Sequence, residues 1–302
     1  MLTIEPSGQI HGATVRGADL SRPLGDEEFS AILLALGTHG VLRFPGQKLD
    51  APALRDFSRR FGSIQGASSS FHEPGVPEVG ILSNVVENGQ PIGLADAGQD
   101  WHTDMSYNQT IGFLNVLFAV KVPRRDGRVL GATAFVNTHA AYDDLPSDVK
   151  TRLRDATATH DFEKFWENMR TRPGSQRAPL SEEQRRRRPP VIHPLFLTHP
   201  ITGRTVLYAN PGYAIRINEL DEAESARMLA FLSEHQLQEK YQYVHRWTEG
   251  EVLAWDHIGT LHQAIADYGP HEPRLMKRCQ VMADRIFNPD FQRLFLPETA
   301  AR

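Results

Sequence analysis

The sequence predicts a mainly β fold, in which an antiparallel barrel carries helices inserted between its strands. Strand-like segments occur at both ends of the chain, turn residues separate several of them, and helical segments cluster between them. The regular alternation of strands and helices that marks a parallel βαβ sheet is missing. The length of 302 residues suits one large β-rich domain. We therefore expect residues 1–302 to form a single domain.

Residues 1–61 predict two short strands, a helix, a third strand and a second helix. Residues 3–24 combine strand-like segments with glycine turns. An acidic stretch then suits a helix start, and an apolar stripe at helical spacing follows until Gly40. Residues 40–44 are strand-like, and residues 51–61 repeat the helical pattern. The apolar faces of both helices are expected to join the core.

Residues 62–98 predict loops, because glycine, serine and proline are frequent and only a short strand at 79–82 interrupts them. Long loops beside a rigid scaffold often contact substrates. His72 lies in this region. We interpret it as a surface histidine in preference to a substrate contact.

Residues 113–120 form a nearly continuous apolar run, the pattern of a strand buried on both faces. A turn at 124–128 leads to another strand at 131–136. Gly131 permits a close backbone approach there. Thr133 puts a hydroxyl on a strand that could line a cavity, although the residue alone indicates an ordinary strand position.

A helix is expected over 137–155, where Pro146 suits the start of a second helix. Residues 160–192 turn polar and basic, and we expect them to form a long insertion that acts as a lid. Four consecutive arginines at 185–188 invite a nucleic-acid interpretation. However, no aromatic residue interleaves with them and the net charge of the chain is −4, so a solvated helix end is the better interpretation.

Strands resume beyond the insertion. Residues 194–198 and 205–208 predict a hairpin by their turn residues. An amphipathic helix is expected at 219–235. Strands at 241–247 and 252–256 follow, which returns the chain to the barrel.

Composition indicates a globular protein of the reducing cytoplasm. Hydrophobic residues make up 40% of the chain and charged residues 23%, values typical of globular proteins. The single cysteine, Cys279, excludes an internal disulfide. The N-terminus lacks the basic head and apolar run of a secretory signal, and no apolar stretch approaches the roughly 20 residues that span a bilayer. We therefore expect a cytoplasmic protein that binds neither membranes nor nucleic acids.

The segment 99–107 contains the first candidate metal ligands. His102 and Asp104 are two positions apart, so in an extended strand both side chains point to one face. A second histidine from a distant element would complete the set of two histidines and one carboxylate that suits Fe(II) and leaves coordination positions open. Taken alone, a His-x-Asp triplet is more often a solvated polar pair.

The C-terminal segment 255–279 supplies the remaining candidates. Arg274 and Arg278 lie twelve and sixteen residues beyond His262, a possible third ligand. Guanidinium groups bind carboxylates bidentately. This arrangement would accept a dicarboxylate that chelates the metal at one end and contacts an arginine at the other.

Together these motifs resemble the taurine dioxygenase (TauD/TfdA) family of Fe(II)/2-oxoglutarate-dependent dioxygenases. Each motif alone is modest, but their order and spacing are highly specific. The resemblance runs from residues 17–20 and the turn at 44–47 through Val281. It is carried by Trp-His-Thr-Asp at 101–104, Gly-Ala-Thr at 131–133, Trp-Asp-His at 255–257 followed by His262, and Arg-Leu-Met-Lys-Arg at 274–278.

The resemblance implies a double-stranded β-helix core, the jelly roll of cupin-like proteins. It implies that His102, Asp104 and His262 are the iron ligands. It also implies Fe(II) as the metal, with 2-oxoglutarate and O2 as cosubstrates. Family members commonly form dimers or tetramers, so a homo-oligomer is expected on the same ground.

The resemblance also assigns the arginines. Arg274 matches the arginine that pairs with the distal carboxylate of 2-oxoglutarate, and Thr133 matches the threonine that supports this carboxylate. Arg278 matches a second arginine, which lies near the anionic end of the primary substrate or near the cosubstrate. His257 and His271 flank His262 but do not match its position.

Departures from the family pattern bear on the substrate. Taurine dioxygenases have a histidine shortly after the Phe-Gly of the second helix, whereas Phe61-Gly62 is followed here by Ser63. Gly98 and Leu130 also replace family residues. A small anionic substrate (a sulfonate, sulfate ester, carboxylate or aryloxyalkanoate) is expected because Arg278 is retained. Desaturation or cleavage by the same fold, and a non-catalytic binding protein, are the alternatives.

Overall fold

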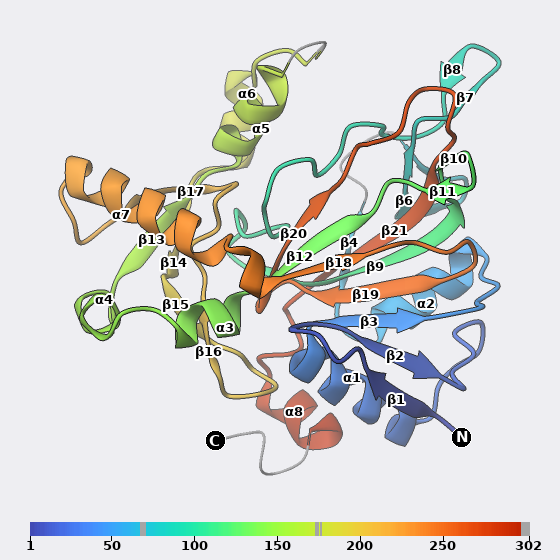
Figure 1. Cartoon of the computed structure of the whole chain (residues 1–302), viewed down its shortest axis with the longest axis horizontal. Coiled ribbons are helices and arrows are strands. Elements are labelled where there is room, and N and C mark those ends of the chain that lie inside the picture. The colour runs from blue at the N-terminus through green and yellow to red at the C-terminus, as the bar shows by residue number, and fades with distance from the viewer. Residues whose placement is uncertain (67–70, 173–174, 176, 297–302) are drawn as a thin grey trace.

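The computed structural model describes residues 1–66, 71–172, 175 and 177–296, and so leaves out four residues of the predicted loop at 62–98 and three of the predicted insertion. Two facing β-sheets form the body of the molecule, with helices packed on the larger sheet and a helical unit beyond the smaller one (Figure 1). The mainly β fold with helical insertions is thereby confirmed.

The larger sheet is antiparallel apart from one parallel pair, β2 with β3. The central strand β9 (Gly112–Lys121) is buried over most of its length, as its continuous apolar run predicts, and β19 and β21 flank it. The sheet order is β1 (Thr3–Pro6), β2 (Ala13–Arg16), β3 (Val41–Phe44), β19 (Val252–Asp256), β9, β21 (Leu275–Met282), β6 (Val76–Ser83) and β5 (His72–Glu73), with β4 (Ile64–Gln65) also paired to β21.

The smaller sheet places β12 (Thr133–Asn137) between β18 (Gln242–His245) and β20 (Thr260–Ala264). In this register Phe135 lies opposite His262. Short ribbons occupy the loops at one end of the two sheets: β7 (Val86–Glu87) with β8 (Gln90–Pro91), and β10 (Arg124–Arg125) with β11 (Arg128–Val129).

Helices α1 (Asp26–His39), α2 (Ala51–Arg59) and α8 (Pro289–Phe295) cover the larger sheet (Figure 1). Phe29 of α1 is fully buried, and its ring lies 5.0 Å from that of Phe295 in α8. Gly40 ends α1 as predicted, because its φ of 69° suits glycine and its N–H donates to the carbonyl of Leu36.

A helical unit lies beyond the smaller sheet. The helix predicted over 137–155 is broken into α3 (Thr138–Asp143) and α4 (Ser147–Arg152), since proline disfavours helical backbone in the residue before it and Pro146 caps the second helix. The remaining elements are β13 (Thr157–His160), β14 (Val191–Pro194) and β17 (Ala214–Ile217) in one sheet, the hairpin β15 (Phe196–Thr198) and β16 (Thr205–Leu207), helices α5 (Phe162–Arg170), α6 (Glu182–Arg187) and α7 (Glu222–Gln236), and the 3₁₀ turn Glu239–Tyr241.

The predicted insertion at 160–192 runs between the paired strands β13 and β14 and contains α5 and α6. Three arginines of the predicted run lie in the exposed α6, where Arg187 pairs with Glu183 and Arg185 lies 2.7 Å from Glu163. These acidic partners support a solvated helix in place of a nucleic-acid surface. Across the described ranges, no helix has both the length and the apolar character needed to cross a membrane.

The buried carboxylate of Glu251 links the two sheets, because it pairs with Arg43 on β3 of the larger sheet and with His245 on β18 of the smaller sheet. Glu251 is 1% exposed; its carboxylate accepts hydrogen bonds from Arg43 at 2.6 Å and from His245 at 2.7 Å. Burial alone would raise the pKa of Glu251, but the hydrogen bond and charge of His245, and then Arg43, outweigh burial and lower it below 4.5. The carboxylate therefore contributes stability above that pH, and this contribution is lost as pH falls through the folded pKa.

Replacing Glu251 with glutamine should lower the free energy of unfolding by about 3 kcal/mol at pH 7, because one partner of a buried ion pair is removed. Urea denaturation from pH 7 to pH 3 measures the effect, and the difference from wild type should narrow only below the pKa of free glutamate. Glu5→Gln, at an exposed pair with Arg16, is the matched control and should change little. A constant difference at all pH values would contradict this account.

Candidate active site

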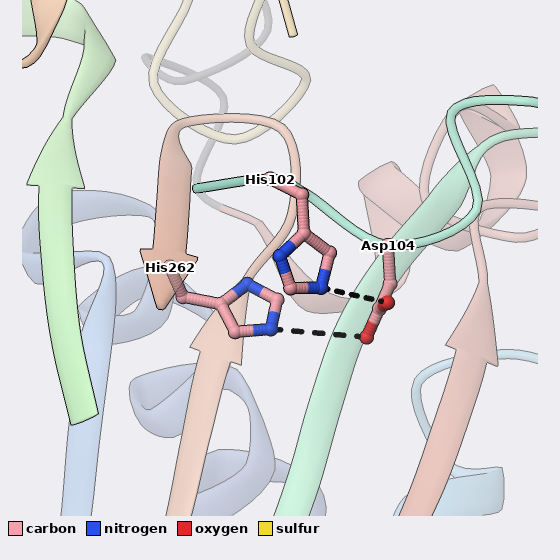
Figure 2. Close-up of side chains that lie close together, drawn as sticks. All are labelled: His102, Asp104 and His262. Atoms are coloured by element: carbon pink, nitrogen blue, oxygen red, sulfur yellow. Dashed lines mark ion pairs between the residues drawn. The ribbon is translucent and has the colours of Figure 1, made fainter. Parts of the chain in front are cut away.

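Two segments far apart in the sequence meet beside the smaller sheet. His262 lies on β20, and His102 lies in the loop that precedes β9 (Figure 2). The backbone N–H of His102 donates to the carbonyl of His262 at 3.0 Å, and the reciprocal bond measures 2.7 Å. This single β-bridge fixes the two imidazoles next to each other, with ring centroids 4.2 Å apart.

The three predicted ligands converge on one point. Nε2 of His102 lies 3.3 Å from Oδ1 of Asp104, and Nε2 of His262 lies 3.9 Å from Oδ2 of the same carboxylate (Figure 2). One donor atom from each residue falls within 4.8 Å of the others, and all three residues are buried. The structure therefore brings His102, Asp104 and His262 together.

The prediction that His102 and Asp104 share an extended strand is wrong. Only His102 forms a bridge, and the residues after Thr103 form turns. Met105 has a φ of 61°, a left-handed backbone conformation that residues other than glycine rarely adopt. The two side chains converge because the chain turns sharply after the bridge.

The orientation of His102 shows that this donor set fits a cation. A carbonyl oxygen only accepts hydrogen bonds, so the 2.7 Å contact from Nδ1 to the carbonyl of Asp100 places the proton of the neutral imidazole on Nδ1. Nε2 then directs its lone pair toward the carboxylate of Asp104. Two electron donors in this position need a cation between them, and two imidazoles with one carboxylate suit non-haem Fe(II).

The protonation states also favour metal binding. Burial alone would raise the pKa of Asp104, but without a metal the hydrogen bond and charge of a protonated His102, followed by the charge of Arg278, hold it well below its usual value. A bound cation takes the place of the proton on Nε2 of His102. Burial, with a smaller contribution from His102, lowers the pKa of His262 well below its usual value. An ionised carboxylate and a neutral imidazole are the forms that coordinate a metal.

Asn115 supports the carboxylate and was not identified from the sequence. Its side chain lies on β9, is fully buried, and donates from Nδ2 to Oδ2 of Asp104 at 2.8 Å. The sequence does contain one sign of this role, because Asn115 is a polar amide inside the apolar run at 113–120. A buried amide in such a strand needs a polar partner, so it indicates a nearby polar site.

A cavity of about 250 Å³ opens beside the three ligands. Thr133, Arg274 and Arg278 line it, so every predicted site residue lies in or around one space. His72 is not among its lining residues. Much of the remaining wall is aromatic or apolar, and the sequence did not identify it: Phe162, Phe165, Trp166 and Met169 from α5, with Tyr107 and Tyr213.

Within the described part of the chain, Arg274 is a buried cation without an anionic partner. It is 7% exposed, and none of the ion pairs formed by the described residues includes it. Its Nε atom has no hydrogen-bond partner among the residues that the structure describes, and the guanidinium lies 5.9 Å from the ring centroid of Tyr268. Burial lowers the pKa of Arg274 because the charge is removed from water. Such a group is prepared for an anion that enters the cavity.

Thr133 accepts a hydrogen bond through Oγ1 from the indole N–H of Trp247 at 3.0 Å, and both residues are buried. Thr133→Val should therefore lower the free energy of unfolding by about 1–3 kcal/mol, because the indole N–H is left buried and unpaired. Chemical denaturation measures the change. Thr133→Ser keeps the acceptor and should cost less; equal losses in both variants would contradict this explanation.

Comparison with known proteins agrees with this geometry. The family model described as "Taurine catabolism dioxygenase TauD, TfdA family" matches residues 3–280. The chain belongs to this TauD/TfdA family. Among curated relatives, pentalenolactone F synthase of Streptomyces avermitilis is 33% identical, with 97% of this chain and 96% of the relative covered. The 2,4-dichlorophenoxyacetate dioxygenase of Cupriavidus pinatubonensis is 31% identical, with coverages of 93% and 98%.

Solved structures of the family have the same fold. AAD-2 in complex with Mn(II) and N-oxalylglycine is 25% identical, with a TM-score of 0.77 over 93% of this chain and 97% of AAD-2. A taurine dioxygenase from Burkholderia xenovorans is also 25% identical, with a TM-score of 0.74 and coverages of 94% and 90%. The jelly-roll core is confirmed. As a TauD/TfdA member the protein is a non-haem dioxygenase that uses Fe(II), 2-oxoglutarate and O2.

Proposed function

We propose that this dioxygenase hydroxylates a small organic acid with an apolar body. His102, Asp104 and His262 hold Fe(II), Arg274 and Thr133 bind the distal carboxylate of 2-oxoglutarate, and Arg278 attracts the acid group of the primary substrate. The convergence of the three donor atoms within 4.8 Å is the observation that carries the proposal. When bound, Fe(II) and 2-oxoglutarate supply the oxidation of a C–H bond by O2, with release of succinate and CO2.

The protein's contribution is to bind and orient the metal and the substrates, and to exclude water from the site. Asn115 holds the carboxylate of Asp104, and the carbonyl of Asp100 holds the ring of His102, so both ligands are preorganised. The unpaired charge of Arg274 lies in the same cavity and gives a dicarboxylate a fixed orientation. Trp247 in turn orients the hydroxyl of Thr133.

Charge balance supports an anionic primary substrate. Fe(II) with Asp104 and Arg274 is neutralised by the two carboxylates of 2-oxoglutarate. Arg278 remains, with Nη1 3.7 Å from Oδ2 of Asp104, as a cation beside the site for a further anion. Relatives named for 2,4-dichlorophenoxyacetate, (S)-phenoxypropionate and sulfate esters agree with a single acid group.

The cavity wall supports an apolar body. The ring of Phe165 lies 4.9 Å from that of His102, and Phe162, Trp166 and Met169 extend the same surface. Aromatic walls favour apolar substrates over compact zwitterions. Together with the missing histidine after Gly62, this surface argues against taurine and for a carboxylate, aryloxyalkanoate or sulfate ester.

The same proposal covers the organisation of the chain. Because α5 forms one wall of the cavity, we propose that the insertion at 160–192 acts as a lid on a single domain of residues 1–302. We further propose a cytoplasmic location, which the single cysteine favours, and from the family resemblance a homo-oligomer, either a dimer or a tetramer.

Succinate release tests the substrate assignment. Purified enzyme with Fe(II), ascorbate, O2 and 2-oxoglutarate is incubated with a panel of aryloxyalkanoates, alkyl sulfate esters, apolar carboxylates and taurine, each matched by its neutral amide or alcohol. We expect acids with an apolar body to stimulate succinate release, and taurine and the neutral analogues to fail. Stimulation by the neutral analogues alone would overturn the proposal; mass analysis of products separates hydroxylation from desaturation and cleavage.

A further inference from the structure

One segment outside the ligand set contacts both parts of the chain that carry the ligands. It comprises the hairpin β15–β16 and the loop that follows, residues 196–213. Gly212 of this segment packs directly on His102: a Cβ at Gly212 would lie 2.9 Å from Cβ of His102. Only glycine permits this approach, so the segment and the ligand loop are in close contact.

Asn210 is the polar centre of this contact. It is 1% exposed, and Nδ2 donates to the carbonyl of Thr103 at 2.9 Å and to Oγ of Ser106 at 2.7 Å. Its Oδ1 accepts from the N–H groups of Gly212 at 3.1 Å and Thr103 at 3.4 Å. The amide therefore uses both donor hydrogens and its acceptor, and Thr103 stands between the two ligands His102 and Asp104.

These bonds replace the strand partners that the ligand loop lacks. After the bridge at His102, the backbone turns away from β20 and passes through the left-handed residue Met105. A conformation of this kind persists only where surrounding contacts over-determine it. Ser106, which Asn210 contacts, is also 3.0 Å from Nδ1 of the buried His160, so the turn is held from two directions.

The same segment supports the third ligand. Nδ1 of His199 accepts from the N–H of Ile201, so Nε2 carries the proton and faces Oδ2 of Asp256 at 3.3 Å. The Asp256 carboxylate accepts from the N–H groups of Ile258 and Gly259, in the turn that leads into β20 and His262. His199 and Asp256 are both buried. The segment therefore contacts both sides of the ligand set.

We propose that Asn210 is a positioning residue of the metal centre, which sets the separation of the His102 and Asp104 donor atoms without contacting metal or substrate. The inference rests on the ligand assignment proposed above. Partners outside the ligand set alter metal affinity by roughly 10- to 100-fold. Asn210 acts on the backbone between two ligands, and a change of that size is expected when its amide is removed.

The test compares Asn210→Ala with Gln236→Ala. Gln236 is fully buried and donates to the carbonyl of Ala209, so this control removes a similar buried amide that does not contact the ligand loop. Anaerobic calorimetry with Mn(II) measures metal affinity, urea denaturation measures stability, and the visible spectrum of the Co(II) form reports ligand geometry. We expect Asn210→Ala to bind Mn(II) roughly 10- to 100-fold more weakly and to shift the Co(II) spectrum, whereas Gln236→Ala does neither.

Equal Mn(II) affinity and unchanged Co(II) spectra in Asn210→Ala would overturn the inference, even if the variant is less stable. If Asn210→Ala does not fold, Ser106→Ala removes the hydroxyl that contacts both Asn210 and His160 but keeps the bonds of Asn210 to Thr103. It should weaken Mn(II) binding in the same direction, and no weakening would also overturn the inference. His262→Ala separates the two proposals. If wild type and His262→Ala bind Mn(II) equally, the ligand assignment fails; if only His262→Ala loses binding, the ligand assignment stands and the role of Asn210 fails.

Discussion

Replacing His262 with alanine should abolish Fe(II) binding and succinate production. His262 supplies one of three donor atoms, whereas the buried His257, whose ring centroid lies 5.8 Å from that of His262, is not among the clustered donors. Even partners outside a ligand set change metal affinity by roughly 10- to 100-fold, so removing a ligand should cost at least about 100-fold. Calorimetry with Mn(II) and a succinate assay measure the two losses.

His271→Ala is the matched control for this experiment. His271 lies nine residues beyond His262, is exposed, and lies outside the cluster of donor atoms. It should bind Mn(II) and turn over 2-oxoglutarate like wild type. Retained metal binding in His262→Ala, or a similar loss in His271→Ala, would refute the assignment of the third ligand.

Replacing Arg274 with methionine should separate cosubstrate binding from metal binding. Truncating one side of a buried, hydrogen-bonded charge pair costs about 2–5 kcal/mol, which is roughly a 30- to several-thousand-fold loss of 2-oxoglutarate affinity. Mn(II) affinity should stay unchanged, because Arg274 is not among the clustered donors. The ligand-free protein should not lose stability, since a buried cation without an anion is replaced by an apolar side chain of similar length.

Arg278→Met is the matched comparison, because it removes the second arginine of the same strand. Its Nη1 lies near Asp104, so the variant should weaken binding of the primary substrate more than that of 2-oxoglutarate. Calorimetry with 2-oxoglutarate, followed by substrate titration, distinguishes the variants. If Arg278→Met carries the larger loss of 2-oxoglutarate affinity, the two arginines have been assigned in the wrong order.

The sequence predicted the class of fold, and it singled out side chains that the structure gathers around one cavity, but it predicted the local backbone less well. Strand and helix patterns located β9, α1 and α2, because burial on one or two faces leaves a periodicity that a single sequence records. The prediction of a strand that continues from His102 to Asp104 was wrong, because two-residue spacing is compatible with either a strand or a turn. The turn depends on Met105 and on contacts with Asn210, which lies more than a hundred residues away in the chain.

The contacts that support the site could not be predicted from the sequence either. Asn115 and Asn210 look like ordinary polar residues until the fold places one beside Asp104 and the other beside Thr103. The aromatic wall that α5 contributes to the cavity was not predicted for a related reason. Residues 160–192 are polar and basic overall, so their composition predicted a solvated lid, whereas the apolar face of one short helix turns toward the cavity.

The most direct test is an anaerobic absorbance titration of the wild-type enzyme with Fe(II) and 2-oxoglutarate. Chelation of ferrous ion by the keto acid should give a weak violet charge-transfer band that saturates at one Fe(II) per chain. In Arg274→Met the band should appear only at much higher 2-oxoglutarate concentrations, and in His262→Ala it should not appear. A wild-type enzyme without the band, or a band unchanged in His262→Ala, would contradict an iron centre built from His102, Asp104 and His262.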